Sequence, residues 1–191
     1  LRDMIQSHLL QLLALVAMEP PVSMTPEHLR DEKVKVLKAI RPITQNAVHA
    51  HAFRGQYASG SVDGKTVPGY MEAAGVAPDS VTETYAALKL TIDNWRWAGV
   101  PFYLRTGKAL GVKRTEVAIK FKQAPFAMFR CTPVETLAQN YLVIGVAPTE
   151  GIALQFNTKV PGPSIRIEGV EMKFRYKDYF KAEPSTGYET L

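Results

Sequence analysis

The sequence predicts an α+β fold in which helices pack on one face of a large, mainly antiparallel sheet. Two observations predict this class. Apolar residues in the first forty positions recur every three or four residues, as on one face of an α-helix, whereas beyond Thr82 they alternate with a period of two, as in strands. Several of these strands follow one another with no room for crossover helices, which favours antiparallel pairing.

The first predicted helix lies in "LRDMIQSHLLQLLALVAM", with an apolar face made of Leu1, Met4, Ile5, Leu9, Leu12, Leu13 and Val16. Pro20 and Pro21 end this helix, because the proline ring blocks continuation and lacks a backbone N–H. His8 lies within the apolar face, and Asp3 lies five residues earlier. Since five residues of an α-helix rise about 7.5 Å, we expect Asp3 and His8 to contact different parts of one small ligand rather than each other. From spacing alone, a hydrogen-bonded core histidine is the commoner interpretation of His8, and a general base is the alternative.

A second helix is predicted from Thr25 as the N-cap residue, Pro26 at the first helical position and Glu27 in the first turn. Its buried stripe consists of Leu29, Val36, Leu37 and Ile40. From Arg54 to Ser80, glycine and proline punctuate the sequence, and we expect a long ordered loop because its tyrosines supply packing groups.

Six strands are predicted after this loop, at residues 84–92, 101–105, 116–121, 141–146, 152–157 and 171–176. In "VAIKFK", the side chains of Val117, Ile119 and Phe121 point to one face and the alternate side chains to the other. This pattern is typical of a sheet with one solvated face.

Composition restricts the class of protein and of partner. The 191 residues are 46% hydrophobic and 21% charged with a net charge of +5, which excludes a disordered chain and favours an acidic partner such as a phosphorylated metabolite, a nucleotide or a nucleic acid. The lone Cys131 excludes an internal disulfide and fits a reducing cytoplasm. We find no signal peptide and no apolar run of the ~20 residues that a membrane span needs, so we expect no membrane partner.

A basic segment, "LRTGKALGVKRTEVAIKFK", places Lys108 and Lys113 beside Gly107 and Gly111. Lysines next to flexible glycine backbone suit a phosphate group. The segment is not a P-loop, because Ala109 replaces the Ser or Thr that would hold magnesium. Two alternatives remain open from the residues alone: an edge strand whose lysines face water, and a nucleic-acid interface. The second is disfavoured because regularly spaced exposed aromatic residues are missing.

Two further pairs of residues receive structural interpretations. His49 and His51 in "VHAH" could begin a metal site, but no carboxylate or cysteine pattern accompanies them, so we expect ordinary strand histidines and no metal. Trp95 and Trp97 could stack on a ligand, and we expect them to serve the core and a turn instead.

Several blocks resemble, in order and spacing, the C-terminal domain of glucose-6-phosphate dehydrogenase of bacterial type. The blocks are "RDMIQSHLLQLLALVAMEPP", "RDEKVKVLKAI", "RGQY", "VTETYAALKLTIDNWRWAGVPFYLRTGKAL" and "TEVAIKFK". The resemblance implies an oxidoreductase that oxidises glucose 6-phosphate at C1 to 6-phosphogluconolactone with hydride transfer to NADP+, the first step of the pentose phosphate pathway.

The same resemblance implies roles for individual residues. His8 matches the catalytic general base, Asp3 a carboxylate that binds the sugar hydroxyls, and Lys108 and Lys113 the lysines of this domain that reach the substrate. Ser7 departs from the family, which usually has Asn at this position.

Under this resemblance, residues 1–191 form the C-terminal substrate and dimerisation domain, truncated at both ends. We expect the nucleotide-binding domain to precede Leu1, since no GxGxxG-like turn occurs in the chain. NADP+ would bind to that domain, and the isolated chain would be inactive. We expect no structural NADP+ on this chain: Arg105 matches one position of such a site, but its other basic and aromatic positions hold Ala118, Gly145, Ala153 and Gln155.

The resemblance also implies a cytoplasmic homodimer or homotetramer that binds no nucleic acid. The alternative function is a non-catalytic module that binds or senses a sugar phosphate through the same pocket.

Overall fold

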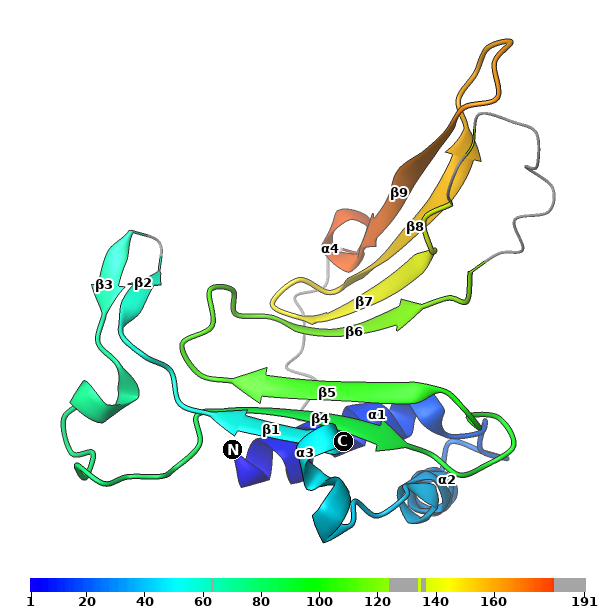
Figure 1. Ribbon diagram of the computed structural model, residues 1–191. Helices are drawn as coiled ribbons and strands as arrows, with labels where there is room; N and C mark the ends of the chain where they lie inside the picture. Colours follow the sequence, from blue (N-terminus) through cyan, green and yellow to red (C-terminus); the bar gives the residue numbers. More distant parts are fainter. Residues whose placement is uncertain (63, 124–133, 135–136, 181–191) are drawn as a thin grey trace. The chain divides into compact units, whose positions relative to one another are not determined.

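The computed structural model describes residues 1–62, 64–123, 134 and 137–180 (Figure 1). Cys131 lies outside these residues. The chain divides into two compact units, Leu1–Gly111 and Val112–Leu191, and each unit is described by itself. None of the helices in the described ranges has the length and apolar character needed to span a membrane.

The first helix of the chain has two parts with different hydrogen bonding. A π-helical turn, η1 (Met4–Leu9), precedes α1 (Leu10–Ala17). The backbone N–H of Leu10 donates to the carbonyl of Ile5, five residues earlier, as in a π-helix. The helix ends before Pro20, as predicted, while the π turn was not predicted.

The second predicted helix is confirmed as α2 (Pro26–Ala39), with Thr25 as its N-cap residue and Pro26 at its start. Val36 is its buried residue, and Leu29, Leu37 and Ile40 are half-buried, as the apolar stripe requires.

A three-stranded antiparallel sheet supports these helices. Its order is β1 (Ala52–Gly55), β4 (Tyr85–Thr91) and β5 (Pro101–Gly107). Helices α1 and α2 lie on one face of this sheet (Figure 1). The buried cluster between them contains Leu13, Ala17, Val36, Leu90, Ile92 and Leu104.

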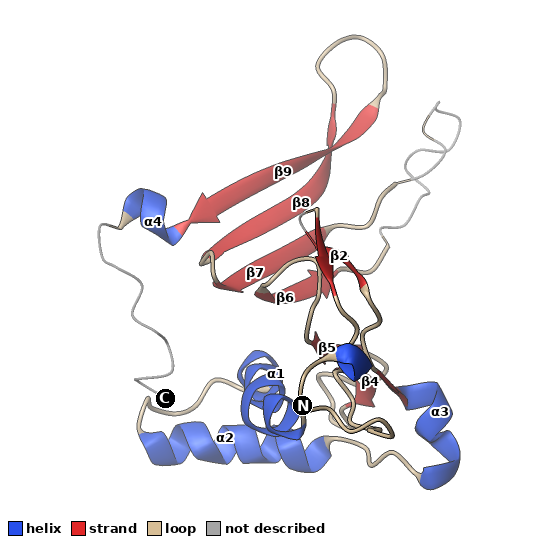
Figure 2. Ribbon diagram, turned by 90° about the vertical axis from the view of Figure 1, so that its left-hand side faces the viewer, coloured by secondary structure: helices blue, strands red, loops and turns tan. Residues whose placement is uncertain are grey.

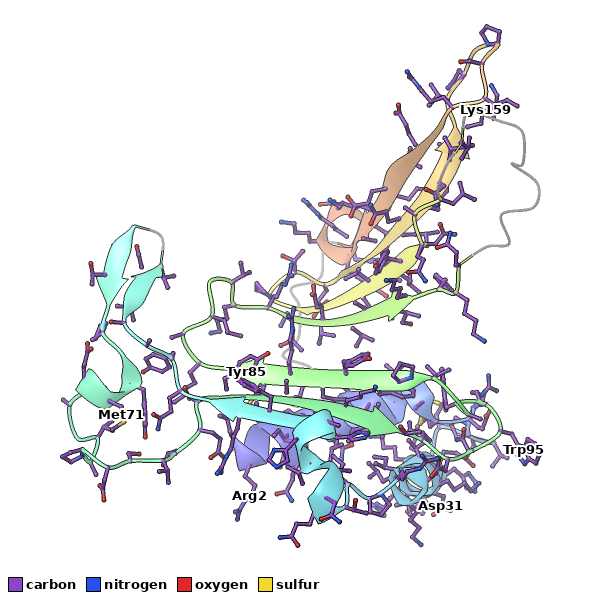
Figure 3. The ribbon with its side chains drawn as sticks, viewed as in Figure 1. Arg2, Asp31, Met71, Tyr85, Trp95 and Lys159 are labelled. Carbon is purple, nitrogen blue, oxygen red and sulfur yellow. The ribbon has the colours of Figure 1, made fainter. Side chains whose placement is uncertain are left out.

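The two tryptophans differ in environment. The indole N–H of Trp97 donates to the carbonyl of Ala17 at 2.9 Å, and its ring packs edge-on against Phe102 beside the core. Trp95 lies in the turn before β5 and is fully exposed (Figure 3). The prediction of core and turn roles is therefore confirmed, one role for each residue.

Two local predictions in this unit are wrong. The stretch predicted as a loop contains a short hairpin, β2 (Gly60–Val62) and β3 (Lys65–Val67), and a 3-10 turn, η3 (Tyr70–Glu72). His49 and His51 lie in a short helix, α3 (Val48–His51), and not in a strand. Such short elements depend on tertiary contacts: the His51 ring nitrogen Nδ1, for example, lies 3.0 Å from the carbonyl oxygen of Lys89 on β4.

The second unit is built on a four-stranded antiparallel sheet in the order β6 (Thr115–Lys120), β7 (Tyr141–Ala147), β8 (Gly151–Lys159) and β9 (Ile167–Arg175) (Figure 2). The short helix α4 (Tyr176–Tyr179) follows β9. Along β6, Val117 and Ile119 are half-buried while Ala118 and Lys120 are exposed, as predicted. Phe121 was predicted on the same face as Val117 and Ile119, but it follows the end of β6 and is exposed.

All six predicted strands are confirmed, and every strand pair in the described residues is antiparallel. The chain therefore has the predicted α+β class. Within the described part of the chain, the strands belong to three sheets of three, two and four strands.

Candidate functional site

The π turn brings together Asp3 and His8, the two site residues predicted in the first helix. His8 Nε2 lies 3.7 Å from Asp3 Oδ2. The expectation that these side chains would not meet is wrong, because it assumed an α-helix. In a π-helix the hydrogen bonds span five residues, so residue i+5 returns to the side of residue i.

The two side chains of this pair differ in exposure. The Asp3 side chain is 79% exposed, whereas that of His8 is 28% exposed. The imidazole is oriented with its Nδ1 atom buried and its Nε2 atom toward the carboxylate. An exposed carboxylate beside a partly sheltered imidazole can bind hydroxyl groups and accept a proton from one of them.

Ser7 holds the other oxygen of the same carboxylate. Its hydroxyl donates a 2.7 Å hydrogen bond to Asp3 Oδ1, the i,i+4 neighbour within the turn. From the sequence, Ser7 was only a departure from the family pattern. The sequence does contain a feature that could have identified Ser7 as a partner of Asp3. Ser7 is a hydroxyl residue four positions after an acidic residue on a helix, a spacing at which side chains interact.

Lys108 belongs to the same unit and directly follows β5, the strand that packs against η1. Its side chain is exposed, and its backbone N–H donates to the carbonyl of Thr84 at 2.8 Å. Thr84 is buried, and its hydroxyl also accepts a hydrogen bond from the backbone of Tyr57. The end of β5 is therefore anchored to the segment before β4, which fixes where Lys108 leaves the sheet.

Gly107 is required where β5 ends. A Cβ atom at this position would lie 2.7 Å from a ring carbon of Tyr85, the residue opposite it on β4. The following turn contains Ala109 with a φ of +52°, a left-handed conformation that is uncommon for alanine. This tight turn leaves the Lys108 ammonium in solvent.

Lys113 belongs to the second unit and is exposed. The neighbouring Arg114 is engaged with Glu116 at 3.3 Å. In the described ranges neither Lys108 nor Lys113 forms an ion pair with a carboxylate. Their ammonium groups carry charge that a phosphate could use.

Two ion pairs brace the unit that carries η1. Arg41, after α2, makes two hydrogen bonds of 2.7 and 2.9 Å to Asp93, after β4. Arg96 in the turn before β5 likewise binds Glu19 beyond α1, with both hydrogen bonds at 2.5 Å. These hydrogen bonds hold the pKa of the Asp93 and Glu19 carboxyls below their ordinary values.

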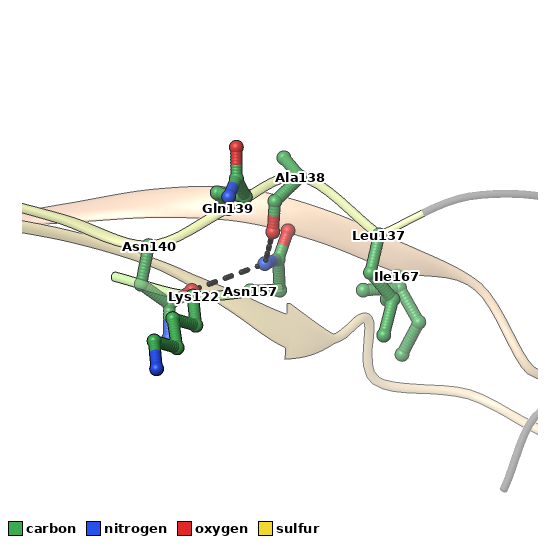
Figure 4. A pocket seen from close by; sticks show the side chains of 7 residues that line it. All are labelled: Lys122, Leu137, Ala138, Gln139, Asn140, Asn157 and Ile167. Atoms are coloured by element: carbon green, nitrogen blue, oxygen red, sulfur yellow. Dashed lines mark hydrogen bonds between the residues drawn. The ribbon is translucent and has the colours of Figure 1, made fainter. Parts of the chain in front are cut away.

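A separate hollow of about 230 Å³ lies at one end of the four-stranded sheet (Figure 4). Asn157 spans it by donating to the carbonyl of Ala138 at 2.6 Å and to the side-chain oxygen of Asn140 at 3.2 Å. Lys122 also lines it, whereas no predicted site residue does. Among the residues that the structure describes, no group of three or more His, Cys, Asp and Glu side chains is arranged to hold a metal ion.

Comparison with known families gives a match along the entire chain. The family model described as "Glucose-6-phosphate dehydrogenase, C-terminal domain" matches residues 1–191. Among curated relatives, a glucose-6-phosphate 1-dehydrogenase from Aggregatibacter actinomycetemcomitans is 49% identical over 191 residues, and one from Chlamydia muridarum is 47% identical over 193 residues. Both alignments cover 100% of this chain but only 38% and 37% of the relatives.

Comparison with solved structures also gives glucose-6-phosphate dehydrogenases. A glucose-6-phosphate dehydrogenase in complex with its substrate glucose-6-phosphate matches with a TM-score of 0.81 and 42% identity, over 95% of this chain and 35% of that one. Glucose-6-phosphate 1-dehydrogenase from Mycobacterium avium matches with a TM-score of 0.74 and 41% identity, over 91% of this chain and 34% of that one.

Proposed function

Because the chain belongs to the glucose-6-phosphate dehydrogenase C-terminal domain family, we propose that it provides the sugar-binding and proton-accepting part of an enzyme that oxidises glucose 6-phosphate. The observation that carries the proposal is the Asp3–His8 pair on the π turn, within a chain that matches the family from end to end. The chain spans 38% and 37% of the length of the two curated relatives described above. We propose that it works as the C-terminal domain of a longer protein.

In the proposed reaction, C1 of the sugar loses a hydride from carbon and a proton from its hydroxyl, which yields the lactone. His8 accepts the hydroxyl proton through Nε2, the ring atom that faces Asp3. Proton removal as the C–H bond breaks avoids a protonated carbonyl and lowers the barrier. Asp3 is acceptor-only when ionised, so its carboxylate binds neighbouring sugar hydroxyls and fixes the ring beside His8.

The lysines recognise the phosphate end of the substrate in this proposal. Lys108 leaves the sheet at an anchored position with its ammonium in solvent, as a point charge for a phosphate dianion requires. We assign Lys113 to the same substrate on the family resemblance, as a second cation from the adjoining segment. The net charge of +5 adds long-range attraction for the anionic sugar.

NADP+ is the hydride acceptor in the proposed reaction. The described residues do not fit its catalytic site, because every strand pair is antiparallel and no strand–helix–parallel strand unit opens with a glycine-rich turn. We propose that another domain of the complete enzyme binds the cofactor. A cytoplasmic location and a homodimeric or homotetrameric assembly are also proposals, on the resemblance alone.

The proposal is tested with the full-length gene product and a spectrophotometric assay of NADP+ reduction. We expect turnover with glucose 6-phosphate and far weaker turnover with unphosphorylated glucose. Calorimetric binding of glucose 6-phosphate without any cofactor reduction would favour the alternative, a non-catalytic sugar-phosphate module. Absence of both binding and turnover would refute both.

A further inference from the structure

The Asp3 carboxylate is held within its own turn by groups at both oxygens. Ser7 Oγ donates to Oδ1 at 2.7 Å, and Oδ2 faces His8 Nε2 at 3.7 Å. We propose that Ser7 is a positioning residue: its hydroxyl holds the Asp3 carboxylate in the orientation that presents Oδ2 to His8 and to the substrate hydroxyls. This inference rests on the proposed function.

The backbone of η1 makes this arrangement possible. Ser7 and His8 are the fourth and fifth residues after Asp3, and the Leu10 to Ile5 hydrogen bond shows that the turn is widened to five-residue spacing. Both residues consequently lie beside the same carboxylate, one at each oxygen. In an α-helix of ordinary pitch the fifth residue would be displaced from Asp3 around the helix axis.

The direction of the Ser7 hydrogen bond indicates a role beyond helix stability. A serine within a helix commonly donates to the backbone carbonyl four residues earlier. Ser7 instead donates to the side chain of the residue four positions earlier, and a hydrogen bond to an ionised acceptor is stronger than one between neutral groups.

The exposure of Asp3 explains why the carboxylate needs such a partner. At 79% exposure, packing does little to restrict its side-chain rotation. An unrestrained carboxylate must lose rotational freedom each time it binds a sugar, which weakens binding. A hydroxyl that holds it beforehand removes part of that loss.

The test uses the full-length enzyme and compares Ser7→Ala with wild type. We expect the KM for glucose 6-phosphate to rise roughly 3- to 10-fold, the worth of one exposed hydrogen bond, with kcat within about twofold. The KM for NADP+ and the thermal midpoint should not change. Ser7→Thr, which keeps the hydroxyl, should stay close to wild type.

Ser23→Ala is the matched control. It removes another serine hydroxyl that contacts a side chain five residues later, His28 Nδ1 at 2.6 Å, but on the segment before α2. We expect its kinetics to equal those of wild type.

A double-mutant cycle separates positioning from a general structural effect. In an Asp3→Asn background, Ser7→Ala should add little further loss, because the two residues act as one unit. An unchanged KM for Ser7→Ala, an equal loss in both backgrounds, or a fall in thermal midpoint with parallel losses in kcat would overturn the role of Ser7.

If wild type is active and Asp3→Asn is impaired while Ser7→Ala is not, only this inference fails. If wild type does not oxidise glucose 6-phosphate, the proposed function fails with it.

Discussion

At the scale of single residues, the chemistry proposed for this chain is concentrated in η1 and in Asp3, its N-cap residue. His8 is partly sheltered, with Nε2 toward the Asp3 carboxylate, whereas His49 on α3 is exposed and distant in sequence from the turn. Both are histidines, so only the environment distinguishes them. The proposed role of His8 therefore depends on where the π turn places its ring.

We predict that His8→Asn in the full-length enzyme lowers kcat by about 10²- to 10⁴-fold, the usual worth of a general base, with a much smaller change in glucose 6-phosphate binding. The amide cannot accept the hydroxyl proton near neutral pH. Steady-state kinetics and a binding titration measure the two effects. His49→Asn is the control, and near-normal turnover of His8→Asn would refute the assignment.

A second prediction concerns Lys108, whose ammonium leaves the end of β5 into solvent. Lys108→Ala should weaken glucose 6-phosphate binding about 10- to 100-fold, because a charge-assisted contact to a phosphate is lost. Binding of unphosphorylated glucose should change far less. Lys38→Ala, which removes an exposed lysine of α2, serves as the control in the same titrations. Equal losses for both sugars would show that Lys108 does not contact the phosphate.

At the scale of elements, the junction between α2 and β4 is fixed by backbone and side chains together. The backbone N–H of Arg41 donates to Thr91, that of Asp93 donates to Ala39, and the Arg41–Asp93 ion pair closes the same junction. Ile92, which is fully buried, lies between these contacts. These contacts hold the C-terminal end of α2 against the end of β4, beside the buried side chain of Ile92.

This ion pair predicts an acid dependence of stability. The hydrogen bond from Arg41 lowers the pKa of folded Asp93, so the stabilisation is complete above the ordinary aspartate pKa and is lost as the pH falls through the lowered value. Asp93→Asn should lower the thermal midpoint at pH 7 by a few degrees at most, since the pair is exposed. The difference from wild type should shrink between about pH 5 and pH 3.

Thermal unfolding followed by circular dichroism across this pH range measures the effect. Asp79 forms no ion pair in the described part of the chain, so Asp79→Asn is the matched control. A difference between wild type and Asp93→Asn that stays constant with pH would contradict the prediction.

At the scale of the whole molecule, we predict that the 191-residue chain alone neither reduces NADP+ nor binds a structural NADP+. The register of the four-stranded sheet aligns Ala118 on β6 with Val143 on β7, Ala153 on β8 and Lys173 on β9. The positions of this row that the family resemblance assigns to such a site, Ala118 and Ala153, therefore carry no charge. Relative to a site with basic residues at these positions, this chain lacks several charge-assisted contacts to the NADP+ phosphates. At roughly 1.5 to 3 kcal/mol each, their absence would remove most of the affinity for this polyanion.

The purified chain is assayed spectrophotometrically with glucose 6-phosphate and NADP+, and its thermal unfolding is followed with and without millimolar NADP+. A ligand that binds the native state raises the midpoint by mass action, so we expect no saturable rise. Appearance of NADPH would refute the first part of the prediction, and a saturable rise the second.

The amino-acid sequence by itself determined the elements that have strong periodicity or clear end signals. The helix beginning at Pro26, the stop before Pro20 and all six strands after Thr82 follow from local patterns, because a buried face imposes a period of 3.6 or 2 on the residues that form it. The family resemblance identified four candidate site residues, His8, Asp3, Lys108 and Lys113. The spacing of residues alone did not decide whether His8 is a core histidine or a general base.

Tertiary structure alone decided the features whose local signal is weak. The four residues of α3 are too few to show a period, and the hairpin within residues 54–80 consists of two three-residue strands. The π turn is the decisive case for function. Its sequence shows the same apolar spacing as an α-helix, but its backbone is π-helical from Met4 to Leu9, and Asp3 lies beside both Ser7 and His8. The choice between these two hydrogen-bond patterns depends on how the whole turn packs against β5, which no local pattern encodes.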